Sequence, residues 1–444
     1  MSLPLRLPGR SALAATVAAA VAATLVAAPL AAQPALSPTE QRLRQYVEQH
    51  REEQIDFLAK AVNINSGSLN LEGVRQVGAL FRAAFDSLGF TTRWAEMPPS
   101  MHRAGHLIAE HRGKPGSTRI LLIGHLDTVF EGEGQQWTRE DSVGHGAGSG
   151  DMKGGDVIIL YALKTLAGAG VLDDANVTVI FTGDEELAGD PLSISRRDLI
   201  ELGKSHDVAL AFEGGSNTTA TIGRRGASTW RLEITARQAH SSGMFSEGGT
   251  YGAIYELARI LDTFRTQLAG EPNLTFNPGI VVGGADVTFD TLQLAGTAAG
   301  KTNIIAPRAV AVGDLRFLSE EQKERARARM REIVAQSLPG ARATISFADE
   351  YPAMAPTAGN ARLLAVYDSA SQALGHGPVE ALDPGRRGAG DISFVAPYID
   401  GLDGLGALGG GSHSPNEWVN LPALARQTER AAVLIYRLSR QAAR

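Results

Sequence analysis

The sequence predicts an α/β protein in which a larger domain, built on a mostly parallel central sheet, is interrupted by a smaller α+β domain. Short apolar runs at residues 120–123, 177–181 and 208–212 have the length and composition of buried parallel strands. A helical stretch at residues 157–166 separates the first two, and such alternation is typical of a parallel α/β sheet. The 444 residues also exceed the usual size of one hydrophobic core, which favours two domains.

Residues 1–32 have the composition of a signal peptide. Arg6 and Arg10 precede a stretch rich in Ala, Val and Leu that ends in small residues. The alternative is a membrane anchor, because about 20 apolar residues can span a bilayer. Alanine is only weakly apolar and Pro29 interrupts the stretch, which favours cleavage. We therefore expect a periplasmic or secreted protein without stable membrane association.

Charge and cysteine content narrow the classes of partner. The formal net charge is -6, too small to indicate a nucleic acid or an anionic membrane as partner. The chain has no cysteine, which excludes disulfides, thiolate metal sites and a cysteine nucleophile. Any bound metal must therefore be held by His, Asp and Glu side chains.

The larger domain is predicted to be discontinuous. Apolar positions at helical spacing between residues 38 and 66 predict one helix, capped by Ser37 or Thr39. The α/β alternation follows, stops near Gly223, and resumes after Pro352 to end in a long helix at residues 421–441. The predicted parts of the larger domain are residues 36–222 and 350–444.

The smaller domain, residues 223–349, has a different pattern. Its elements follow the order βαββαβ, which is typical of an antiparallel sheet with helices on one face. Five of these six elements can be placed: a strand at 229–236, a helix at 251–268, strand-like residues 304–317, a charged helix at 320–336 and a strand at 343–347.

Polar clusters follow the three predicted parallel strands at the point where each ends: residues 124–127, 184–186 and 213–215. In open α/β sheets, ligands bind in the crevice beyond the carboxyl ends of the strands. One carboxylate in such a place is usually a helix cap or a solvated turn. Three clusters of metal-ligand type at consecutive strand ends instead predict a shared site.

Spacing within these clusters indicates metal chemistry. His125 and Asp127 are two residues apart and face the same side of an extended chain, so Asp127 can hold the second ring nitrogen. Glu185 and Glu186 are adjacent, so one can bind a metal while the other reaches a water molecule.

Two glycine-rich segments add further candidates. Residues 148–155 place Asp151 near a helix start, and residues 410–417 place His413 on a glycine-flanked turn. Neither residue alone would indicate a function. Together with the clusters at the strand ends, both are candidates for the same site.

Together these five motifs, in this order, resemble the family of metallo-aminoacylases, glutamate carboxypeptidases and succinyl-diaminopimelate desuccinylases. The resemblance implies a zinc-peptidase-like catalytic domain, a dimerisation role for the smaller domain and two Zn²⁺ per chain. It also implies Glu185 as the general base that activates the metal-bridging water, with Asp127 orienting His125. The implied ligands are His125, Asp151 and Glu213 for one zinc, and Asp151, Glu186 and His413 for the other, with Asp151 bridging.

Other similarities to the family lie in the smaller domain. Residues 238–242 are similar to a motif whose histidine, here His240, enters the active site of the neighbouring subunit. Asn303 and Arg316 resemble a pair that binds the carboxylate of the substrate. Arg316 follows an apolar run, and a buried arginine needs a partner such as an incoming carboxylate. The alternatives are an ordinary surface histidine and an ordinary surface arginine.

The predicted function is hydrolysis of a peptide or amide bond beside a free carboxylate, by a homodimeric exopeptidase of the glutamate carboxypeptidase kind. The alternatives are an N-acyl amino acid amidohydrolase, a dipeptidase of the same fold and a non-catalytic metal-binding relative. All five ligands and Glu185 are present, which favours an enzyme. The segments after Glu186 depart from the family, with residues 187–190 differing in sequence and extra residues that include Arg196 and Arg197, so the preferred substrate stays open.

Overall fold

The computed structural model describes residues 35–132, 136–291 and 293–443, and the predicted signal peptide lies outside these residues. Within these ranges no helix has both the length and the apolar character needed to cross a bilayer.

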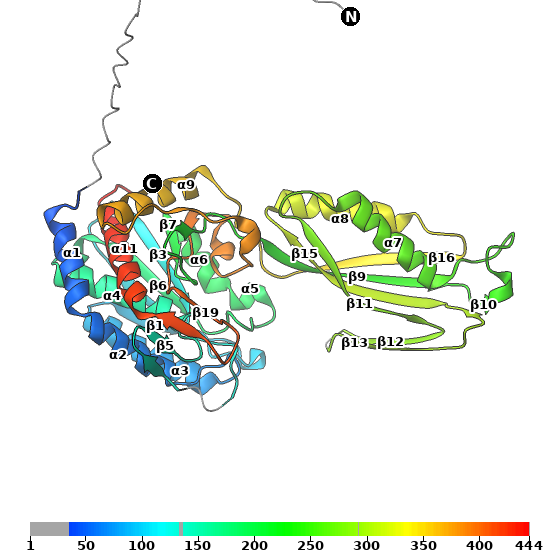
Figure 1. Ribbon diagram of the computed structural model, residues 1–444, viewed down its shortest axis with the longest axis horizontal. Helices are drawn as coiled ribbons and strands as arrows, with labels where there is room; N and C mark the ends of the chain where they lie inside the picture. The colour runs from blue at the N-terminus through cyan, green and yellow to red at the C-terminus, as the bar shows by residue number, and fades with distance from the viewer. Residues whose placement is uncertain (1–34, 133–135, 292, 444) are drawn as a thin grey trace, which may run out of the picture. The chain divides into compact units, whose positions relative to one another are not determined.

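The larger sheet has six strands and is mostly parallel, as predicted (Figure 1). The three predicted strands are parallel neighbours within it, and an antiparallel pair forms one edge. The strands, in spatial order, are β1 (Thr91–Ala95), β2 (His106–His111), β6 (Asn176–Thr182), β3 (Arg119–His125), β7 (Val208–Ala211) and β18 (Asp400–Leu402).

Both faces of the central strands β6, β3 and β7 are buried, which explains their largely apolar sequences. On β3, Ile120 and Leu122 pack into the core that contains α4 and α11, whereas Leu121 and Ile123 pack against residues of α6 and α10. The helices that pack with this sheet are α3 (Leu71–Ser87), α4 (Lys153–Gly168), α5 (Leu192–Ser195), α6 (Arg197–Ser205), α9 (Ala358–Ala373), α10 (Ile392–Val395) and α11 (Leu421–Ser439).

The single helix predicted over residues 38–66 is wrong, because the chain forms α1 (Pro38–Gln49) and α2 (Arg51–Val62) with a break at His50. The His50 ring stacks on Tyr46 and its Nδ1 donates to the Tyr46 carbonyl at 2.8 Å, so the side chain competes with the helical hydrogen bonds. Ser37, rather than Thr39, caps α1 in a reciprocal capping box with Glu40.

Small sheets and single turns complete this part of the chain. A four-stranded sheet links the two glycine-rich segments. The loop that carries His413 joins two of its strands, and the segment that carries Asp151 follows a third. Its order is β19 (Gly409–Gly410), β20 (Trp418–Asn420), β5 (Val143–His145) and β4 (Thr138–Glu140). The remaining elements are β8 (Thr219–Ala220), paired with β17 (Glu380–Ala381), and the 3₁₀ turns η1 (Pro99–Met101), η2 (Leu172–Asp174) and η4 (Pro384–Arg386).

A second sheet and its two helices form an α+β unit with the predicted βαββαβ order (Figure 1). The strands are antiparallel, in the order β11 (Thr275–Gly284), β15 (Arg308–Phe317), β9 (Gly226–Ala236) and β16 (Ala341–Asp349). Helices α7 (Gly252–Leu268) and α8 (Glu320–Ala335) pack with the sheet around a separate core that contains Trp230 and Phe264.

Strand β11 has no clear strand pattern in the sequence. It carries Pro278 and Gly279 and shifts register between Pro278 and Ile280, so it lacks a regular alternation of apolar residues. Short elements extend the α+β unit: the hairpin of β12 (Asp286–Asp290) and β13 (Ala295–Ala299), the pair β10 (Ala239–His240) and β14 (Ile304–Ile305), and the turn η3 (Ser241–Gly243).

Candidate metal centre

The carboxyl ends of the parallel strands and two glycine-rich loops bring seven side chains of the predicted site together. Strand β3 ends at His125, the segment after β6 carries the paired glutamates, and Glu213 follows β7 closely. The turn before α4 and the loop between β19 and β20 supply one residue each. The seven residues are His125, Asp127, Asp151, Glu185, Glu186, Glu213 and His413.

Three carboxylates face the Nε2 atom of His125. Its distances are 3.4 Å to Asp151 Oδ1, 3.6 Å to Glu213 Oε1 and 4.0 Å to Glu185 Oε2. These atoms come from four separate segments of the chain, so tertiary folding alone creates the cluster.

His413 completes the other side of the cluster. Its Nε2 lies 3.1 Å from Glu186 Oε2 and 3.4 Å from Asp151 Oδ2. The two oxygens of Asp151 therefore face two different histidines, which is the arrangement a bridging carboxylate needs between two cations.

The buried Nε2 atom of His125 indicates that a cation fits this site. The side chain is 1% exposed, and among the described residues Nε2 has no hydrogen-bond partner. Its Nδ1 donates to the backbone carbonyl of Asp127 at 3.0 Å, with the Asp127 carboxylate 3.5 Å away. This bond leaves Nε2 as the ring nitrogen that faces the carboxylates. A buried polar atom without a partner is costly, and a cation held by imidazole and carboxylate ligands would satisfy it.

The charges of the cluster also favour a bound cation. Burial, together with the charge of Asp151, raises the pKa of both Glu186 and Glu213 to about 7. Burial and the charge of Glu213 raise the pKa of Glu185 well above its ordinary value. Bound cations would relieve this repulsion and favour the ionised carboxylates. Two sets of three residues can each hold a metal ion: His125, Glu185 and Glu213, and His125, Asp151 and Glu186.

Comparison with known proteins identifies the chain's family. Residues 121–437 match Peptidase family M20/M25/M40. The chain belongs to this family.

Individual relatives agree with the family match. The M20 chain is 29% identical over 393 residues to carboxypeptidase G2 of Pseudomonas sp. (strain RS-16), covering 86% of this chain and 88% of that protein. It is 25% identical over 371 residues to a succinyl-diaminopimelate desuccinylase of Gluconacetobacter diazotrophicus, covering 80% and 90%. A Bacillus subtilis protein, YXEP, described as a dinuclear metal-binding M20 peptidase, has a similar fold with a TM-score of 0.61 at 14% identity, covering 89% and 99%.

The resemblance found from the motifs is thereby confirmed at the level of the family. The protein is an enzyme of the M20 metallopeptidase and amidohydrolase group, and its fold is that of M20 peptidases. Members of this group are metal-dependent, and the cluster around His125 is the candidate metal site in this M20 hydrolase.

The carboxylate of Asp127 makes hydrogen bonds to three other residues in this M20 site. It accepts the backbone N–H groups of Glu185 at 2.9 Å and Glu186 at 3.0 Å, and the hydroxyl of Ser68 at 2.6 Å. The loop that carries the paired glutamates is therefore anchored to the histidine's own strand end.

Glu417 is a site residue that sequence reasoning missed. It is buried, and its carboxylate accepts the backbone N–H groups of Gly148 at 2.7 Å, Gly150 at 2.8 Å and Asp151 at 2.8 Å. It thus joins the loop of Asp151 to the loop of His413. Glu417 lies within the glycine-rich motif at residues 410–417, but its partners are more than 260 positions away in the sequence.

Three predicted site residues lie on the α+β unit, and no described contact joins them to the cluster. His240, on β10, is exposed and its ring contacts Ser242. The carbonyl of Asn303 accepts the N–H of Ser241 at 2.9 Å, so His240 and Asn303 are neighbours. The expectation of a buried Arg316 is wrong: its side chain is 35% exposed, and its Nε donates to Asp314 at 3.0 Å.

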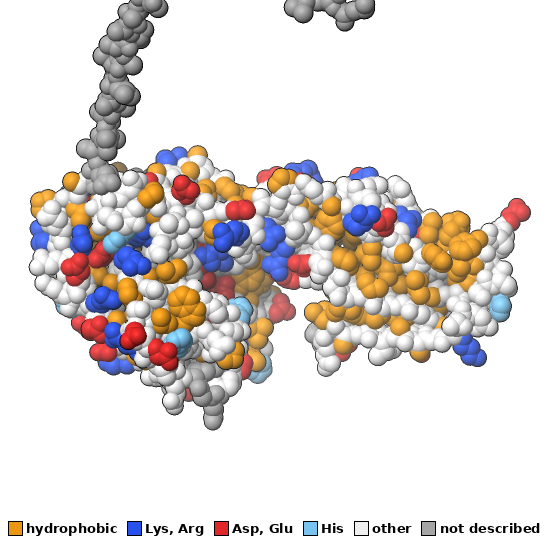
Figure 2. Space-filling view, in the orientation of Figure 1, with side chains coloured by type: hydrophobic (Ala, Val, Ile, Leu, Met, Phe, Trp, Pro, Cys, Tyr) orange, Lys and Arg blue, Asp and Glu red, His pale blue; other side chains and the backbone are white. Residues whose placement is uncertain are grey.

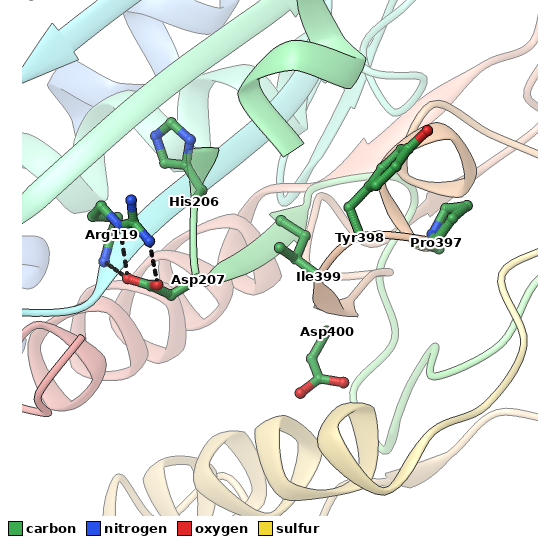
Figure 3. A pocket seen from close by; sticks show the side chains of 8 residues that line it. Arg119, His206, Asp207, Pro397, Tyr398, Ile399 and Asp400 are labelled. Atoms are coloured by element: carbon green, nitrogen blue, oxygen red, sulfur yellow. Dashed lines mark hydrogen bonds and ion pairs between the residues drawn. The ribbon is translucent and has the colours of Figure 1, made fainter. Parts of the chain in front are cut away.

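A separate hollow of about 440 Å³ lies at the amino ends of β3, β7 and β18 (Figure 3). Arg119, at its edge, pairs with Asp207 through Nε and Nη2. Arg119 begins β3 and His125 ends it. The hollow therefore lies at the amino ends of the strands, and the metal-site cluster lies at their carboxyl ends. Arg119 and Asp207 already pair with each other and Asp400 pairs with Arg362, so this hollow is not the candidate site.

Proposed function

We propose that this M20 hydrolase is a two-zinc exopeptidase of the glutamate carboxypeptidase kind, which cleaves the amide bond next to a free carboxylate. The observation that carries the proposal is the buried Nε2 of His125, which faces carboxylates and has no hydrogen-bond partner among the described residues. The match to a carboxypeptidase over 86% of the chain supports the choice of bond.

In this proposal His125, Asp151 and Glu213 hold one zinc, and Asp151, Glu186 and His413 hold the other. Imidazole and carboxylate donors suit zinc. When bound, the metal pair supplies a Lewis acid that polarises the scissile carbonyl and lowers the pKa of the attacking water.

Glu185 is the proposed general base. Its carboxylate is largely buried at the edge of the cluster, 4.0 Å from His125 Nε2, and the backbone N–H bond to Asp127 fixes the residue. Glu185 takes the proton of the attacking water and delivers it to the leaving nitrogen.

A screen of N-acyl-glutamates, N-acyl aromatic amino acids and dipeptides tests the substrate class. We expect the highest kcat/KM for N-acyl-glutamates and related substrates with a terminal carboxylate. A preference for acylated aromatic amino acids or for dipeptides would replace this proposal with an aminoacylase or a dipeptidase of the same fold. We also propose that the enzyme acts after export, in the periplasm or outside the cell, which N-terminal sequencing of the mature protein would test.

Arg316, with Asn303, is the proposed clamp for the free carboxylate. In this role the substrate competes with Asp314 for the guanidinium. Arg316→Ala should lower kcat/KM for acid substrates by about 30-fold. This is near the lower end of the roughly 2 to 5 kcal/mol for truncating one partner of a buried charge pair, as expected for a pair that only substrate binding buries. Arg308→Ala, on the same strand, is the matched control and should change kcat/KM little. Equal turnover of acid and amidated substrates by the wild type would remove Arg316 from this role.

We further propose a homodimer in which the partner subunit's His240 completes each active site. Large hydrophobic side chains lie exposed on the α+β unit, and Figure 2 shows such side chains gathered there. Exposed apolar surface of this kind is typical of an interface. The exposed residues are Phe245, Ile254, Tyr255, Val281 and Leu294.

Subunit mixing tests the shared site. Glu185→Gln and His240→Ala proteins should each be nearly inactive. After exchange, the site on the His240→Ala chain of a mixed dimer keeps its own Glu185 and receives His240 from its partner. Random exchange makes about half of the dimers mixed with one working site each, so activity should recover to about a quarter of wild type. Verified exchange without recovery would show that His240 does not act across subunits.

A further inference from the structure

The peptide group between Glu185 and Glu186 is held at both ends by side chains. Its N–H, from Glu186, donates to Asp127, and its carbonyl, from Glu185, accepts the hydroxyl of Tyr351 at 3.0 Å. This peptide lies between the end of β6 and the start of α5, outside regular secondary structure. Side-chain hydrogen bonds, rather than a ladder of backbone bonds, therefore set the position of the proposed base.

Arg196 holds Tyr351 in place. Its Nη2 donates to the Tyr351 hydroxyl at 3.0 Å and to the Asp184 carbonyl at 3.0 Å. The guanidinium is fully buried and pairs with the carboxylates of Asp184 at 2.6 Å and Asp391 at 2.8 Å. Buried ion pairs persist where every charge is paired and hydrogen-bonded, so this network is a defined structure around the glutamate loop.

Tyr351 reaches the loop from a distant part of the chain. It follows β16 closely, and its backbone carbonyl accepts the N–H of Ala227 in β9 at 2.8 Å. Its ring packs edge-on against Phe394, with ring centroids 4.9 Å apart. The ring is thus fixed by packing, and the hydroxyl is the atom that contacts the carbonyl of Glu185.

We propose that Tyr351 is a positioning residue for Glu185, kept in place by Arg196. The proposal rests on the general-base role of Glu185 given above. Reaction rates respond steeply to the placement of reacting groups. The loss of one hydroxyl that fixes the base should therefore lower kcat by about 10-fold, within the roughly 100-fold that a 1 Å displacement can cost.

Tyr351→Phe is the variant that tests this role, because it keeps the ring and its contact with Phe394. Any change at Arg196 would leave two buried carboxylates unpaired and endanger the fold. Tyr161→Phe is the matched control, since the Tyr161 hydroxyl also donates to a glutamate carbonyl, that of Glu53 at 2.9 Å, away from the site. We expect Tyr351→Phe to lower kcat with KM and metal content unchanged, and Tyr161→Phe to keep full kcat.

A double-mutant cycle separates positioning from a general structural effect. If Tyr351 acts through Glu185, Tyr351→Phe should cause no further loss in a Glu185→Gln background. Full kcat in the single variant, loss of bound metal, an equal fall in the Tyr161→Phe control or an additive loss in the double variant would each overturn the inference. A fully active Glu185→Gln protein would instead show that Glu185 is not the general base, the part of the proposed function on which this inference rests.

Discussion

Glu185→Gln should lower kcat by about 10² to 10⁴-fold, the usual contribution of a general base, while the protein keeps its metal. Glutamine preserves the size of the side chain and cannot accept the proton of the attacking water. The measurement is kcat together with the metal content of the purified variant, and Glu186→Gln is the paired control, which should lose metal.

The geometry makes this pair of variants decisive. The carboxylate of Glu185 and that of Glu186 each belong to a set of three residues that could hold an ion. If Glu185→Gln loses metal and keeps its activity per bound metal, the two glutamates have exchanged roles, with Glu185 as ligand and Glu186 as base.

Asp151→Asn should abolish measurable turnover and reduce the metal content. Each oxygen of Asp151 faces a different histidine, and an amide nitrogen cannot serve as the second ligand atom. We expect a loss greater than the roughly 10- to 100-fold that removal of an outer hydrogen-bond partner costs. Asp173→Asn, at an exposed position in η2, is the control and should behave as wild type. Normal activity and metal content in Asp151→Asn would exclude a bridging role.

The central strands could be predicted because burial of both faces requires a run of apolar residues, which can be read from the local sequence. The runs at β3 and β7 are apolar throughout, and the run at β6 contains one polar residue, the buried Thr178. Each run ends in polar residues that meet at the carboxyl ends of the strands. The family resemblance rests on the same clusters, and the family match confirms it.

Features that depend on contacts between distant residues, or on a single side chain, produce no such local sequence pattern. The apolar spacing of α1 continues into α2, so the pattern does not reveal the break that the His50 side chain makes. Glu417 looks like a flanking residue until folding places it against the loop of Asp151. Arg316 was expected to be buried, but Asp314, two residues earlier on the same strand, pairs with it at the surface.

The roles of the site residues follow from one claim, that the cluster around His125 holds a pair of catalytic metal ions. Metal analysis of the purified enzyme, combined with chelation and reconstitution, tests it most directly. We predict about two ions per chain, loss of activity on their removal and recovery when Zn²⁺ is returned. Full activity in a verified metal-free preparation would contradict the account.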